Sequence, residues 1–187
     1  MNWIKLEQLL LKTEADRAVT AEPPLNHAQL CAQALSLAAG LQAQGVQRVA
    51  VHLEDAADLA IALLGAWRAG VSVLLPTDLQ AQTRQRWSSD VDLWLTDQPD
   101  DAHLSDFNVA PLDAAALDLD RCALSLCTSG SSGEPKRIDK TLRQLVNEVP
   151  HHLAISEPGT LSGKAVDLPR LAVDDSIHDH GKLLTKV

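Results

Sequence analysis

"VQRVAVHLEDAADLAIALLGAWRAGVSVLLP" spans Val46 to Pro76 and carries the clearest folding signal in the chain. Its two ends are short valine-rich runs, which are typical of buried strands. The segment between them is rich in alanine and leucine, which favour helix. Asp55 and Asp58 suit the positive end of a helix dipole, and Gly70 suits a helix C-terminus. The stretch therefore predicts a strand, a helix and a second strand.

The flanking sequence repeats this alternation. Upstream, Asn26 can cap a helix over residues 27–45, which ends in Gly45. Downstream, residues 77–90 favour a third, more polar helix and residues 91–97 a third strand. We therefore predict an α/β fold with a mostly parallel sheet flanked by helices on both faces.

The two ends of the chain give weaker signals. Residues 2–16 have apolar positions at roughly helical spacing and predict a short amphipathic helix. Residues 98–120 are acidic and predict a connecting loop with one short strand. A further helix is expected over residues 141–152, stopping or kinking at Pro150.

Beyond Pro150 the sequence has no clear period of two or 3.6. We predict a subdomain over residues 1–150 and an irregular or disordered tail over residues 151–187. A metal site formed by Asp174, Asp175, His178 and His180 is one alternative for this tail, and a solvated segment is the other.

Composition narrows the class of protein. The 187 residues are 45% hydrophobic and 22% charged, as in globular domains. A net charge of -9 argues against a general nucleic-acid binder. The three cysteines lack metal-ligand spacing, and no apolar run reaches membrane-spanning length. We find no signal peptide and expect a cytoplasmic protein.

"CTSGSSGEPKR", residues 127–137, follows a predicted strand and has the chemistry of an anion site. Glycines let backbone N–H groups converge on a phosphate, hydroxyl groups add donors, and a lysine adds charge. The spacing matches neither the common P-loop nor the Gly-x-Gly-x-x-Gly motif. A flexible serine–glycine linker is the alternative interpretation.

This loop resembles the phosphate loop of the adenylate-forming (AMP-binding) superfamily, which includes acyl-CoA synthetases. Its pattern is roughly [ST]-[SG]-G-[ST]-[ST]-G-x-P-K, usually followed by glycine. Arg137 departs from that glycine. The helix–strand run upstream is also similar to this family, and the resemblance covers about residues 26–150.

The resemblance implies ATP- and Mg²⁺-dependent activation of a carboxylic acid to an acyl-adenylate, often followed by transfer to coenzyme A. It implies that the loop holds the ATP phosphates; no catalytic residue and no metal ligand is assigned. The residues expected to contact the phosphates are Thr128, Ser129, Gly130, Ser131, Ser132, Gly133 and Lys136.

Other motifs implied by the resemblance are absent after the loop: there is no Gly-x-[ST]-Glu and no tyrosine anywhere. We therefore expect an N-terminal part of an acyl-CoA synthetase-like ligase, inactive as this isolated chain. A non-catalytic nucleotide- or polyphosphate-binding or interaction module, and a vestigial truncated product, are the alternatives. A change of reading frame near Pro150 is a further hypothesis. We also expect self-association through uncovered apolar surface. We expect no nucleic-acid partner and no membrane span.

Overall fold

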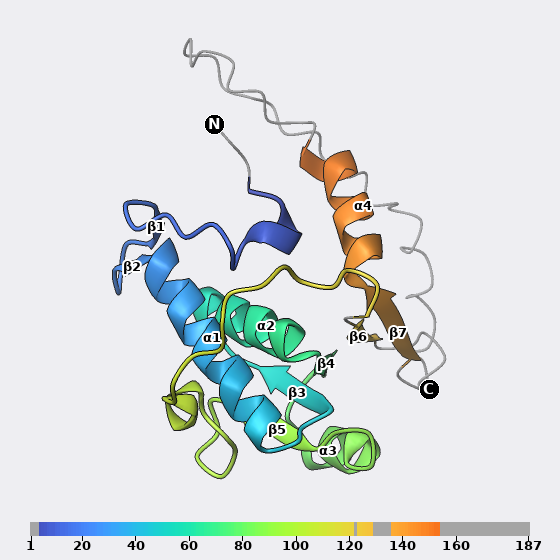
Figure 1. Cartoon of the computed structure of the whole chain (residues 1–187). Helices are drawn as coiled ribbons and strands as arrows, with labels where there is room; N and C mark the ends of the chain where they lie inside the picture. Colours follow the sequence, from blue (N-terminus) through green and yellow to red (C-terminus); the bar gives the residue numbers. More distant parts are fainter. Residues whose placement is uncertain (1–3, 122, 129–135, 154–187) are drawn as a thin grey trace, which may run out of the picture. The chain divides into compact units, whose positions relative to one another are not determined.

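The computed structural model describes residues 4–121, 123–128 and 136–153. Within these ranges a small antiparallel pair of strands precedes a larger α/β unit (Figure 1). The elements in chain order are η1 (Leu6–Gln8), β1 (Ala18–Thr20), β2 (Leu25–Asn26), α1 (His27–Ala43), β3 (Arg48–His52), α2 (Ala56–Ala69), β4 (Ser72–Leu75), α3 (Ala81–Trp87), β5 (Leu93–Thr96), η2 (Leu104–Phe107), β6 (Ala123–Thr128), β7 (Lys136–Thr141) and α4 (Leu142–Leu153).

The main sheet has the strand order β5-β3-β4-β6-β7. The pairs β5–β3, β3–β4 and β4–β6 are parallel, and β7 runs antiparallel to β6. The predicted mostly parallel sheet is therefore confirmed. Parallel strands need crossover connections, and α2 provides the one between β3 and β4.

The helix ends follow the local signals. The side chain of Asn26 accepts a hydrogen bond from the backbone N–H of Gln29, whose side chain bonds back to Asn26. The carboxylate of Asp55 caps α2 by accepting hydrogen bonds from the backbone N–H groups of Ala57 and Asp58. Gly45 and Gly70 adopt φ values of 70° and 76°, which suit glycine after a helix.

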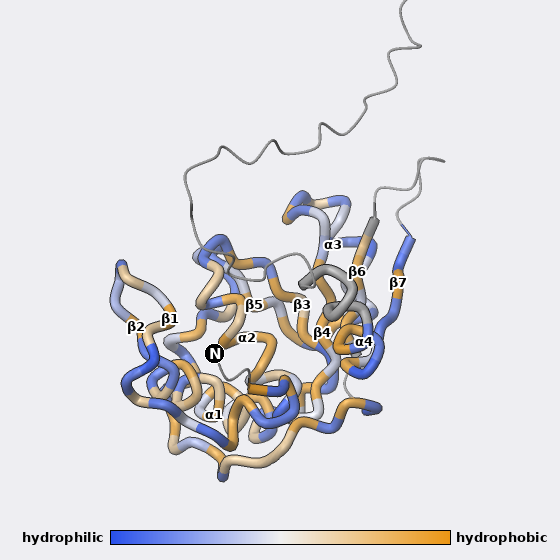
Figure 2. Tube along the Cα trace, turned by 90° about the horizontal axis from the view of Figure 1, so that it is seen from above, coloured by the Kyte–Doolittle hydropathy of each residue, from blue (hydrophilic) through white to orange (hydrophobic). Residues whose placement is uncertain are grey.

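One face of the sheet forms the main core with α1 and α2. Val49, Val73 and Leu124 pair across β3, β4 and β6, so their side chains share this face, and all three are buried. The two helices approach closely at Gly65, where an added Cβ would lie 2.8 Å from the Ala34 carbonyl oxygen. The aliphatic core needs few aromatic residues. Figure 2 shows hydrophobic residues concentrated along the central elements and a mostly hydrophilic β7.

The opposite face of the sheet carries α3 and a smaller core. Ala50 and Leu74, which pair across β3 and β4, are buried against Trp87 of α3. Arg84 of α3 lies 4.7 Å from the ring centroid of Trp94 and forms a bidentate ion pair with Asp101. Helices thus flank the sheet on both faces, as predicted. The third helix is only seven residues long, shorter than the expected range of 77–90.

The N-terminal prediction is wrong: residues 4–16 form the short η1 and turns, not an amphipathic helix. The apolar residues pack against α1 without a continuous helix. Leu10 is fully buried, and the Cys31 thiol of α1 donates to the Leu9 carbonyl at 3.4 Å. The backbone N–H of Glu14 donates to the ring of buried His27. Hydrogen bonds to α1 therefore pair backbone groups of this segment that a regular helix would have paired internally.

Residues 98–120 form an extended connection with η2 and a single bridge between Leu95 and Ala102, without the expected strand. The connection is held by backbone bonds to distant elements. Leu112 donates to the Leu35 carbonyl of α1, and Leu117 donates to the Glu7 carbonyl. This route carries the chain to the start of β6.

The final helix differs from its prediction at its end. It runs from Leu142 to Leu153 and passes through Pro150, so the helix does not stop there, and the alternative expectation of a kink at Pro150 stays a prediction. Leu142 is fully buried and Leu145 packs on the main core. This anchors α4 at its first turn, next to β7.

Candidate functional site

The carboxyl ends of the parallel strands meet at one edge of the sheet. The strands β3, β4, β5 and β6 end at His52, Leu75, Thr96 and Thr128. Ligands of open α/β sheets bind outside this edge. The candidate phosphate loop leaves from it after Thr128, at the end of β6.

The two ends of that loop are joined by a β ladder. Six residue pairs connect β6 with β7, from Ala123 opposite Thr141 to Thr128 opposite Lys136. Thr128 and Lys136 form the last pair. The structure therefore places these two predicted phosphate ligands side by side in the backbone. The other predicted ligands, Ser129, Gly130, Ser131, Ser132 and Gly133, lie outside the described residues.

The sequence analysis missed β7. Its sequence, KRIDKT, contains one apolar side chain, Ile138, and the four residues from Lys136 to Asp139 are exposed. Strand propensity is therefore weak. A usable signal existed, because a predicted strand followed by a glycine- and proline-containing loop is a common start of a hairpin.

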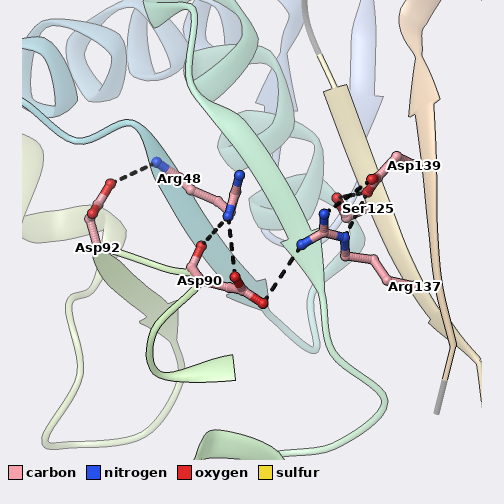
Figure 3. A network of polar contacts seen from close by, with 6 residues as sticks. All are labelled: Arg48, Asp90, Asp92, Ser125, Arg137 and Asp139. Carbon is pink, nitrogen blue, oxygen red and sulfur yellow. Dashed lines mark hydrogen bonds and ion pairs between the residues drawn. The ribbon is translucent and has the colours of Figure 1, made fainter. Parts of the chain in front are cut away.

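Arg137, the departure from the family's glycine, joins a polar network on the α3 face (Figure 3). Its Nη1 lies 3.7 Å from Asp90, and its Nε lies 3.1 Å from Asp139. Asp139 also accepts a 2.5 Å hydrogen bond from Ser125 Oγ of β6. On the far side, Arg48 of β3 donates to the Asp90 carbonyl oxygen at 2.8 Å.

Charge alternates along this network, so each carboxylate has a cationic neighbour. Asp92 accepts bonds from the backbone N–H groups of Arg48 and Gln47, which lower the pKa of its carboxyl. Burial raises the pKa of the Cys127 thiol, which stands opposite Arg137. Burial therefore favours the neutral form of the Cys127 thiol.

Further carboxylates fix the turns at the strand ends. A hydrogen bond from Thr83 is the main cause that lowers the pKa of Asp78, which follows β4. Asp97, which follows β5, accepts from the Glu54 backbone N–H at 2.9 Å. Burial raises the pKa of Asp58, with the charges of Asp55 and Asp97 adding to the effect.

These acids act as structural groups. Asp55 caps α2 and Asp58 lies in its first turn, in agreement with their interpretation as helix-start residues. Across residues 4–121, 123–128 and 136–153, no cluster of three or more histidine, cysteine or acidic side chains is arranged to hold a metal ion. The alternative metal site at Asp174, Asp175, His178 and His180 lies outside the described residues.

Two cavities lie beside α1, away from the loop ends. Their volumes are about 400 and 470 Å³, and Gln33, Asp58 and Ile61 line both. Residues of η2 also line the smaller cavity, and residues just before β2 also line the larger one. Neither cavity is lined by Thr128 or Lys136.

No protein-family model and no curated protein matches the chain. Solved structures do. The chain is similar to o-succinylbenzoate coenzyme A synthetase (MenE) from Bacillus subtilis in complex with AMP, with a TM-score of 0.64 and 21% identity over 81% of this chain and 46% of that one. The same enzyme in complex with ATP and magnesium ion gives a TM-score of 0.63 and 21% identity, over 81% and 47%.

A third similar structure is the N-terminal subdomain of NpsA from Klebsiella oxytoca, with a TM-score of 0.57 and 21% identity over 70% of this chain and 39% of that one. These likenesses confirm the predicted fold, that of the N-terminal part of adenylate-forming enzymes. The chain spans less than half the length of the synthetase chains that it resembles.

Within residues 4–121, 123–128 and 136–153, no helix is both long enough and apolar enough to cross a membrane.

Proposed function

We propose that this chain supplies the phosphate-binding part of an ATP-dependent, carboxylate-activating ligase and binds MgATP, without completing the reaction alone. One observation carries the proposal. The ladder between β6 and β7 closes the loop at the carboxyl edge of the sheet, with Thr128 opposite Lys136. The surrounding fold is that of synthetase chains solved with AMP and with ATP and magnesium ion.

The residues at this edge suit a polyphosphate. Lys136 is a compact cation placed where β7 begins, and the loop sequence adds hydroxyl groups and glycine N–H groups. We assign contacts with the β- and γ-phosphates to Thr128, Ser129, Ser131 and Lys136. Donors held there stabilise the charge that develops on leaving pyrophosphate.

Magnesium ion fits the same proposal without a protein cage. Mg²⁺ is usually bound through substrate phosphates, retained waters and one or two carboxylates. When bound, Mg²⁺ offsets phosphate charge.

The chain's own residues do not account for the whole reaction. The sequence after the loop lacks the Gly-x-[ST]-Glu motif and any tyrosine, and the acid to be activated has no assigned pocket. We therefore propose that acid activation and any transfer to coenzyme A require groups that this chain lacks. A module that binds nucleotide or polyphosphate without chemistry is the second candidate, because the β6–β7 ladder alone brings Thr128 and Lys136 together.

Nucleotide binding is tested with the full chain by its melting temperature in MgATP. Ligand at ten times its Kd adds about 1.4 kcal/mol of stability, which raises the Tm by about 3–6 °C for a chain of this size. The Lys136→Ala variant should lose this rise. Lys140→Ala is the matched control, because it removes the same charge from the same face of β7.

Acid-dependent exchange between ATP and pyrophosphate tests whether the chain completes any chemistry alone. We expect no exchange by the isolated chain. Exchange that disappears in Lys136→Ala would show that the chain is a complete catalyst and contradict the proposed division of labour. An unchanged Tm for the wild-type chain would remove nucleotide binding altogether and favour a vestigial product.

A further inference from the structure

The network around Arg137 links parts of the sheet that no strand pairing joins. Arg137 lies on β7, at one edge of the sheet, and its partner Asp90 lies in the turn between α3 and β5, the strand at the other edge. Asp90 in turn contacts Arg48 of the interior strand β3. Figure 3 shows this link passing over the α3 face of the sheet.

The contacts of this network hold Arg137, which directly follows Lys136 in the chain. In the described residues, β7 pairs only with β6, so its first residues have ladder bonds on one side. Arg137 adds side-chain contacts there: Asp90 at 3.7 Å, and Asp139 at 3.1 Å. Because successive strand residues point to opposite faces, these contacts also fix the side from which Lys136 projects.

Surface ion pairs contribute little to folding stability, and Arg137 and Asp90 are each about one third exposed. A network of several charges restricts geometry more than a single pair does. Arg137 is also next to two carboxylates, Asp90 and Asp139, which offset its charge. These observations suit a residue that orients its neighbour better than one that binds an anion itself.

We propose that Arg137, held by Asp90, is a positioning residue that orients Lys136 for polyphosphate binding. The proposal rests on the proposed function of the loop. It assigns a role to the one residue that departs from the family pattern: glycine leaves the exit of the loop free, whereas arginine ties that exit to the α3–β5 turn.

Asp90→Asn distinguishes positioning from direct anion binding by the sign of its effect. The substitution removes a negative charge and releases Arg137. If Arg137 were itself a phosphate ligand, affinity for an anion would rise. If Arg137 positions Lys136, affinity falls although the chain becomes less acidic. Glu54→Gln is the control for the loss of a negative charge, because it removes an exposed carboxylate just after β3, at the carboxyl ends of the strands from which the loop leaves.

The experiment measures Kd by titration calorimetry for MgATP and for inorganic tripolyphosphate, using the full chain. We expect Asp90→Asn and Arg137→Gly each to weaken binding by about three- to tenfold, and their combination to weaken it no further. Arg137→Lys, which keeps the charge without the planar fork, should fall between wild type and Arg137→Gly. Glu54→Gln should bind as wild type does.

Circular dichroism and melting temperatures without ligand show whether each variant is folded. Arg137→Lys still tests the proposal if Arg137→Gly fails to fold. Wild-type binding with equal or tighter binding by Asp90→Asn overturns the positioning role alone. Failure of wild-type chain to bind either probe removes the proposed function, and the positioning role with it.

Discussion

Arg84 and Asp101 form a bidentate ion pair that fastens α3 to the end of β5. The two nitrogen–oxygen distances are 2.9 and 2.5 Å, and the Asp101 side chain is only 10% exposed. Thr96 Oγ1 donates to the same carboxylate at 2.6 Å. The Asp101 carboxylate therefore connects α3, through Arg84, with the last residue of β5, Thr96.

Asp101→Asn should destabilise the chain by about 2–3 kcal/mol, because it leaves a partly buried guanidinium without its charged partner. The free energy of unfolding in urea measures this loss. Asp100→Asn is the matched control: it removes the same charge from the preceding, exposed residue. Equal effects of the two substitutions would show that net charge matters and the ion pair does not.

The pH dependence of stability should reflect the same carboxylate. Hydrogen bonds from Arg84 are the main cause that lowers the pKa of Asp101. The unfolded-state value is about 3.9, so the folded chain binds this proton less readily. The stabilisation is fully present above the unfolded pKa and is lost as pH falls through the folded one.

The difference in urea midpoint between wild type and Asp101→Asn should therefore be constant near neutral pH and shrink below about pH 4. Asp78, Asp92 and Asp120 also have lowered pKa values, so wild type itself should weaken in acid. A difference that persists unchanged at the lowest pH would exclude ionised Asp101 as its cause.

Gly65→Ala tests the contact between α1 and α2. The new Cβ would lie 2.8 Å from the Ala34 carbonyl oxygen and 2.8 Å from Leu37 Cδ2. A backbone oxygen cannot move aside without moving its helix, so we expect a loss of about 1–3 kcal/mol. This outweighs the gain of about 1 kcal/mol in helix propensity.

Gly45→Ala provides the comparison, measured by the same urea titration. No atom lies within 4 Å of its added Cβ, and only the positive φ of 70° opposes the substitution. Its cost should be about 1 kcal/mol. A stabilised Gly65→Ala variant would mean that the helices separate easily.

Much of this fold could be predicted because its signals are local. Asn26, Asp55 and Gly70 act at helix ends through contacts with residues a few positions away, and valine-rich runs mark buried strands wherever they pair. The same holds for the loop, whose spacing is a local pattern. These features do not depend on knowing the rest of the structure.

The sequence predictions fail where contacts between residues far apart in the chain determine the local structure. Ile4, Leu6, Leu9 and Leu10 recur at roughly helical spacing, but the Leu9 carbonyl bonds to Cys31 of α1 and Leu10 is fully buried, outside a regular helix. The strand β7 has little propensity of its own and exists because β6 offers it six partners. In the sequence, Arg137 only departs from the glycine of the phosphate-loop pattern. Its contact with Asp90 depends on the fold, because the two residues are far apart in the chain.

Self-association remains a prediction, and the exposed apolar residues suggest where to test it. Ile138 on the edge strand β7 is 43% exposed, and Val109 in the long connection is 47% exposed. We expect concentration-dependent association in sedimentation velocity, weakened by Ile138→Thr and unaffected by Val109→Thr. A monomer at every concentration would contradict the prediction. Equal weakening by both would point to general apolar exposure.

The loop should discriminate nucleotides by their number of phosphates. The proposed contacts are with the β- and γ-phosphates, so affinity should follow the order ATP, ADP, AMP, and tripolyphosphate should compete with ATP. Calorimetric titrations with Mg²⁺ give each Kd. Lys136→Ala should weaken ATP by about tenfold or more, as for the loss of a charge-assisted contact, and should change AMP little.

Ionic strength supplies an independent check on the same contacts. Screening weakens interactions between charges near solvent, so added salt should weaken ATP binding by wild type more than by Lys136→Ala. Lys140→Ala should keep the wild-type salt dependence, because Lys140 stands opposite Leu124, four residues from the loop end. Equal affinity for AMP and ATP would mean that the loop does not hold the outer phosphates, and the assignment of Lys136 would be wrong.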